Sequence, residues 1–82
     1  MDLSPRELRR TIVMLRARGE AENDRADIAD EAQQMKEVRL HIRRADACFA
    51  AARRWEAVLA DIEARHREED RGRDTTPPGR QH

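Results

Sequence analysis

The chain has 82 residues, of which 41% are charged and 38% hydrophobic, and its formal net charge is +0 at pH 7. This length allows one small domain at most, and no net field draws the chain to nucleic acid or to a membrane. We find no apolar run as long as a membrane span and no signal-peptide core, so we expect a cytoplasmic protein. Cys48 is the only cysteine, which excludes an intrachain disulfide and fits a reducing compartment.

The first predicted element is a short helix over residues 5–18. Ser4 is a good N-cap residue, Glu7 stands three residues later as in a capping box, and Pro5 suits the first helical position. Gly19 suits the left-handed residue that ends many helices. The face that we expect to pack against a second helix carries Leu8, Ile12 and Leu15.

The second predicted element is a long helix over residues 25–71, a stretch with neither Gly nor Pro. Asn23 and Asp24 offer N-cap side chains, and the acids that follow favour a helix N-terminus. We expect residues 72–82, which contain Pro77-Pro78-Gly79, to form a flexible tail. The apolar row of the long helix steps by four and three residues and shifts by one residue near position 56: Met35, Val38, Ile42, Ala45, Phe49, Ala52, Trp55, Leu59 and Ile62.

These two elements predict an all-α fold, a helical hairpin of one short and one long helix within residues 1–71. The short helix would cover the long one only as far as about residue 40. Apolar side chains beyond that point would stay in water at a cost of about 1.5–3 kcal/mol each, so we expect a second copy of the chain to cover them. The predicted interface of this antiparallel coiled-coil or four-helix dimer consists of Ile42, Ala45, Phe49, Ala52, Trp55, Leu59 and Ile62.

Charge is distributed in blocks that favour the same assembly. Residues 1–18 have a net charge of +3, residues 20–37 of −5, residues 39–54 of +4 and residues 56–70 of −4. A hairpin that turns near Gly19 lays the first block on the second. The third and fourth blocks share one helix, so they meet only across an antiparallel dimer centred near Trp55.

Two binding chemistries have weaker support. Glu63 and His66 match the Glu-x-x-His step of di-metal bundles, and Glu37 and His41 form a second Glu/His pair at helical spacing. Such pairs are common by chance in a Glu-rich helix, so we expect no metal and no cofactor. The third charge block could contact a nucleic-acid backbone, but we rank nucleic acid below protein as a partner because no aromatic base readers are interleaved with its arginines: Arg39, Arg43, Arg44, Arg53 and Arg54.

No acid, base and nucleophile are placed together in the sequence, so we do not expect an enzyme. Val13 and Met14 are left over from the packing face of the short helix, and Arg9, Arg10 and Arg16 surround them. An apolar centre with a charged rim is typical of a protein-binding patch. The sequence therefore predicts a small homodimeric interaction module (an adaptor, assembly factor or inhibitor from a bacterium or phage) with an unidentified protein partner. The alternatives are a nucleic-acid-binding regulator and a metal-binding bundle.

Overall fold

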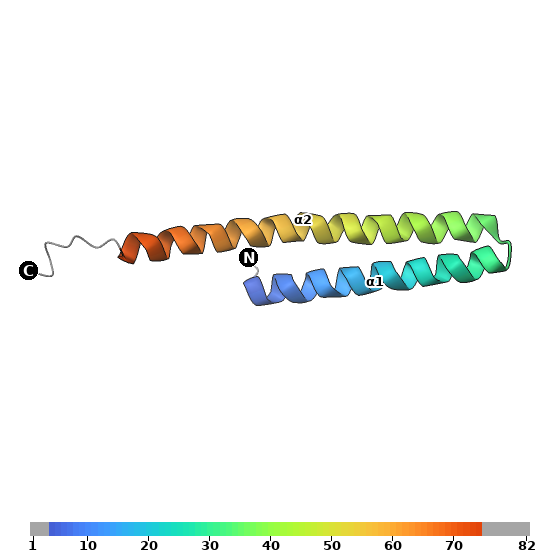
Figure 1. Cartoon of the computed structure of the whole chain (residues 1–82), viewed down its shortest axis with the longest axis horizontal. Coiled ribbons are helices and arrows are strands. Elements are labelled where there is room, and N and C mark those ends of the chain that lie inside the picture. Colours follow the sequence, from blue (N-terminus) through green and yellow to red (C-terminus); the bar gives the residue numbers. More distant parts are fainter. Residues whose placement is uncertain (1–3, 75–82) are drawn as a thin grey trace, which may run out of the picture.

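The computed structural model describes residues 4–74, which form two antiparallel helices joined by a tight turn. Helix α1 spans Pro5–Glu31 and helix α2 spans Met35–Asp74. The two lie side by side, and α2 continues well beyond the start of α1 (Figure 1). No strand occurs in this part of the chain, so the prediction of an all-α helical hairpin is confirmed. Residues 75–82 of the predicted tail lie outside the described residues.

The start of α1 is the predicted one. Ser4 has an extended backbone, and its hydroxyl oxygen accepts a hydrogen bond of 3.2 Å from the backbone N–H of Glu7. Pro5 occupies the first turn, where its missing N–H removes no intrahelical bond. The local N-cap signal therefore determines where α1 begins.

The predicted end of α1 is wrong, because the helix continues through Gly19 to Glu31 and has 27 residues. Gly19 lies inside the helix and is buried, so its role is to allow close packing and not to form a turn. A Cβ at this position would lie 2.7 Å from Cζ of Phe49, so only glycine allows the ring to approach. The acids that we assigned to the start of the second helix instead occupy the C-terminal half of α1, where they oppose the helix dipole.

The turn between the helices is a Schellman motif without glycine. Gln33 has φ 58, in the left-handed region. The N–H of Gln34 donates to the carbonyl of Ala29 and the N–H of Gln33 donates to that of Asp30, both at 2.9 Å. The carbonyl of Gln34 then accepts from the N–H of Val38 at 3.0 Å, which begins α2. The predicted start of the second helix near residue 25 is therefore wrong by about ten residues.

The face of α1 that packs against α2 follows a strict seven-residue repeat. Its members are spaced alternately by four and three residues, the pattern of a coiled-coil seam. The predicted members Leu8 and Ile12 are buried, and Leu15 is half-buried. Beyond them the seam is made of small residues and one acid, all of them buried: Gly19, Glu22, Ala26 and Ala29.

Helix α2 presents the same repeat without interruption. Val38, Ala45 and Ala52 are buried, and the half-buried His41 and Cys48 lie between them in the three- and four-residue steps. The shift that we predicted near position 56 disappears once these two residues are placed in the seam. The repeat continues through the half-buried Trp55, Leu59 and Ile62.

Two ion pairs fix how far α1 extends along α2. Arg9 pairs with Glu63, and Arg16 pairs with Glu56, so a step of seven residues along α1 matches a step of seven back along α2. This is the register of an antiparallel coiled coil, whose flanking positions carry such pairs. Helix α1 therefore covers α2 as far as Glu63, well beyond the predicted limit near residue 40.

The charge blocks pair in a different order from the predicted one. The first and second blocks both lie on α1, so they cannot face each other within the hairpin. The basic first half of α1 lies against the acidic part of α2 that contains Glu56 and Glu63. The acidic second half of α1 lies against the first turns of α2, where Lys36, Arg39, Arg43 and Arg44 give a basic excess.

Candidate interaction surface and a buried polar layer

One carboxylate is buried in the apolar seam. Glu22 has 4% of its surface exposed, and among the described side chains it is the one charged residue that is buried. Its Oε1 accepts from Nη1 of Arg25 at 2.6 Å, and its Oε2 lies 3.1 Å from Nδ1 of His41. A buried carboxylate needs such partners, because it loses its hydration. Glu22 thus joins α1 to α2 through a polar contact in the middle of the hairpin.

The hydrogen bond from His41 lowers the pKa of Glu22 below its ordinary value of 4.5, and Arg25 adds to this effect. Burial acts in the opposite direction but does not outweigh these partners. The ionised form of Glu22 is therefore favoured in the folded hairpin.

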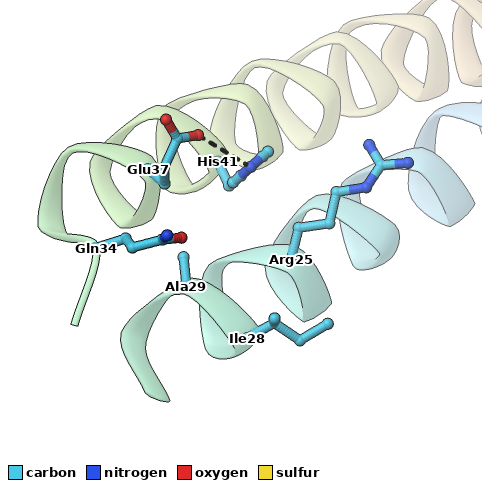
Figure 2. Close-up of a pocket in the computed structure, with 6 residues that line it drawn as sticks. All are labelled: Arg25, Ile28, Ala29, Gln34, Glu37 and His41. Carbon is cyan, nitrogen blue, oxygen red and sulfur yellow. Dashed lines mark ion pairs between the residues drawn. The ribbon is translucent and has the colours of Figure 1, made fainter. Parts of the chain in front are cut away.

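Beside this layer is an open hollow of about 310 Å³ near the turn. Figure 2 shows Glu37 and His41 on α2, joined by a dashed line, with Arg25 and Ile28 on α1 and Gln34 at the turn. Oε2 of Glu37 lies 3.8 Å from Nε2 of His41. Within residues 4–74 no group of three or more His, Cys, Asp or Glu side chains is placed to hold a metal ion. Glu63, the first residue of the Glu-x-x-His step, is paired with Arg9.

The predicted dimer interface falls largely inside the hairpin. Ala45 and Ala52 each have 1% of their surface exposed, so α1 of the same chain covers them. Phe49 lies against Gly19 of the same chain, and Trp55, Leu59 and Ile62 are half-buried. The premise that this row lacks a cover in its own chain is therefore wrong. Ile42 is the exception, because it lies beside the seam with 45% of its surface exposed.

Large apolar side chains are exposed elsewhere on the hairpin. They fall on both helices and are 41–67% exposed: Val13, Met14, Ile28, Met35, Ile42 and Val58. Met14 and Ile28 are fourteen residues apart on α1, with the exposed Ala21 midway, so the three form one stripe along the helix. Met35 and Ile42 are seven residues apart on α2, in line with Phe49.

The residues of the predicted partner patch have different surroundings. Val13 and Met14 are 65% and 60% exposed, as a binding patch requires. Arg9 and Arg16 form the ion pairs with α2, whereas Arg10 is exposed. Two of the three arginines expected at the rim therefore also hold the hairpin together.

The arginines of the third charge block stay at the surface. All five are exposed, and within residues 4–74 none forms an ion pair. Arg39 makes one contact, donating from Nε to the carbonyl of Met35 at 3.4 Å. Their basic surface is thus not neutralised by direct pairing with the acids of α1.

Sequence reasoning missed Glu22 and His41 as partners, although a signal was present. Both occupy seam positions of the seven-residue repeat, and His41 follows Val38 by the three-residue step. Reading only apolar residues as seam members hides that repeat. A polar residue at such a position typically fixes the register of a coiled coil.

The comparisons with known proteins give no relative for this hairpin. No family model, no curated protein and no solved structure matches the chain. Over residues 4–74, neither helix has an apolar stretch long enough to cross a membrane.

Proposed function

We propose that the chain is a small protein–protein interaction module whose first partner is a second copy of itself. The observation that carries this proposal is the exposure of six large apolar side chains, between 41% and 67%, on a hairpin whose own seam is already filled. Single exposed apolar residues are ordinary, but aligned ones indicate a contact surface. A two-helix chain also buries little surface by itself, so association adds stability.

The buried polar layer supports a binding role more than catalysis. Glu22 is held by Arg25 and His41 within the seam, so its carboxylate oxygens already have partners. The contact between Glu22 and His41 specifies the register in which α1 packs against α2. In this proposal the hairpin is a rigid rod that presents side chains to partners, as an adaptor, assembly factor or inhibitor does.

Val13 and Met14, with Arg10 nearby, form the patch that we propose for contact with proteins.

Sedimentation equilibrium at micromolar concentration tests the self-association directly. We expect the mass of a dimer or a higher oligomer, which falls toward 9.6 kDa on dilution. A helical chain that stays monomeric over the whole concentration range would contradict the proposal.

A second candidate function, nucleic-acid binding, is favoured by the five exposed arginines between positions 39 and 54. We rank it lower because α1 places an excess of acids beside the first three of them, which weakens their field. Titration of labelled single-stranded and duplex oligonucleotides at two salt concentrations decides between the two. Submicromolar affinity at physiological salt with a steep salt dependence would move this candidate to first place.

A further inference from the structure

The stripe on α1 defined by Met14, Ala21 and Ile28 lies away from the seam. These residues are spaced by seven, so they share one side of the helix, two positions beyond the seam residues Ile12, Gly19 and Ala26. Met14 is 60% exposed and Ile28 is 67% exposed, and nothing in the described hairpin covers them. The stripe has a small residue at its centre and a large one at each end.

This pattern is symmetric about Ala21. When two such helices run antiparallel and cross at Ala21, Met14 of one copy meets Ile28 of the other at both ends. The small central residue lets the helix axes approach, and the large residues fill the space on either side. A twofold contact requires a surface that is complementary to itself in this way.

The net charges of the two halves of α1, on either side of Ala21, are similar in size and opposite in sign. Residues 5–18 carry five arginines and one acid, and residues 19–31 carry six acids and one arginine. An antiparallel pair of α1 helices therefore sets a net charge of +4 against −5 at each end. A parallel pair would set like charge against like, which opposes association.

One flanking pair makes this complementarity specific. Arg18 and Asp24 each lie three residues from Ala21 on opposite sides, and both are exposed. Antiparallel pairing centred on Ala21 brings Arg18 of one copy beside Asp24 of the other, twice in each dimer. Within residues 4–74 neither side chain forms an ion pair in its own hairpin.

The apolar stripe on α2 does not have this property. An antiparallel contact centred on Ile42 would place Arg43 and Arg44 of both copies beside the twofold axis, so it would set bases near bases. Phe49 of that stripe is also occupied against Gly19. The charge pattern thus selects α1 over α2.

We propose that two copies of the hairpin associate through their α1 helices, antiparallel and centred on Ala21. This inference rests on the proposed self-association and specifies its surface. It differs from the sequence-based expectation, which placed the twofold axis near Trp55 of the long helix. Helix α2 then lies on the outer side of each hairpin, and its arginines stay accessible.

Single cysteines in a Cys48→Ala background test this geometry. Ala21→Cys should crosslink to itself under mild oxidation, because the two copies meet there. Met14→Cys alone should not, since positions 14 of the two copies lie about 21 Å apart along the axis at 1.5 Å per residue, beyond disulfide reach. An equal mixture of Met14→Cys and Ile28→Cys chains should crosslink, and Cys48→Ala alone is the control. Sedimentation and circular dichroism of each reduced variant check that it is folded and associated.

The outcomes separate this inference from the proposed function. Rapid crosslinking of Met14→Cys to itself would show a parallel pair and overturn the inference. A dimer mass with no crosslink at position 21 would also overturn it, because the contact would lie elsewhere, while the proposed self-association would stand. A monomer mass for the unmodified chain would contradict both.

Charge exchange gives a second, independent readout. Arg18→Glu and Asp24→Arg should each weaken dimerisation about tenfold, because each substitution makes two exposed ion pairs of the dimer repulsive. The double variant restores both pairs with the signs exchanged, so its dimerisation constant should return close to that of the unmodified chain. A double variant as weak as the product of the two single effects would overturn the pairing.

Discussion

Glu22 shows how one polar residue can determine the register of a helix pair. A slip of α1 by one heptad along α2 would remove the carboxylate from His41 and leave a buried charge without that partner. Apolar seam residues such as Ala26 and Ala29 discriminate poorly between registers, because alanines pack against many neighbours. The polar contact therefore supplies specificity that the small seam residues lack.

Replacing Glu22 by Gln should remove a contribution to stability that depends on pH in a defined direction. Because the pKa of Glu22 is lowered in the folded state, its charge stabilises the fold above pH 4.5. That contribution is lost as the pH falls through the lower pKa of the folded hairpin. The melting temperature of the variant should lie below that of the unmodified chain at neutral pH, and the difference should shrink below pH 4.5. Glu20→Gln on the exposed face is the control; an equal difference at all pH values for Glu22→Gln would refute the linkage.

Gly19 and Phe49 should show a sign reversal in a double-mutant cycle. Gly19→Ala gains about 0.5–1 kcal/mol of helix propensity, but overpacking against the ring costs about 1–3 kcal/mol. We expect a net loss of about 1 kcal/mol in the unmodified chain and a gain of about 0.5–1 kcal/mol in a Phe49→Ala background. Urea unfolding at one fixed protein concentration measures both. A stabilising effect of Gly19→Ala in both backgrounds would mean that the ring does not pack on Gly19.

At the level of the helices, the sequence predicts the start of α1 correctly but misplaces the turn between α1 and α2. The Ser4 cap is local, so six residues were enough to place it. Gly19 has the chemistry of a helix end, and only its distant neighbour Phe49 shows why a glycine is needed inside the helix. The real turn at residues 32–34 has no Gly, Pro, Asn or Asp, so no local turn signal marks it. Long-range packing decided where α1 ends.

The candidate surface was predicted in part for the same reason. Val13 and Met14 were recognised as apolar residues outside the seam, and both are exposed. Ile28 falls within residues 25–71, which the sequence analysis assigned to the second helix. Its true position becomes visible only when α1 is known to continue through Gly19, which aligns it with Met14.

Substitution of Gln33 tests the turn itself. Its φ of 58 is unfavourable for a residue with a side chain. Gln33→Gly should raise the free energy of unfolding by about 0.5–1 kcal/mol, because relief of this conformation exceeds the cost of the additional conformational entropy that glycine gives the unfolded chain. Gln33→Val should lower it, since a β-branched residue resists the left-handed region. The reverse order of the two melting temperatures would be inconsistent with the Schellman turn.

For the whole molecule, the charges of α1 have two roles, one within the hairpin and one in the proposed dimer. The basic first half and acidic second half of α1 match the opposite charges of α2, which orients the hairpin. In the proposed dimer the same two halves match each other across a twofold axis. Charge blocks can guide several pairings at once because Coulomb interactions are not exclusive. The sequence-based prediction of a dimer along the long helix used the same charge pattern but a different pair of segments.

The central claim is that α1 runs unbroken through Gly19 and folds back on α2 of its own chain. An isotope-filtered nuclear Overhauser experiment on the Phe49 ring tests it most directly, because Phe49 is the only phenylalanine and its signals need no disambiguation. We expect contacts between the ring protons and the α protons of Gly19 in uniformly labelled protein, and none in a mixed-label sample that reports only contacts between chains. Helical chemical shifts at Gly19 should accompany them. Ring contacts that appear only between chains, or loop shifts at Gly19 with no ring contact, would contradict the hairpin.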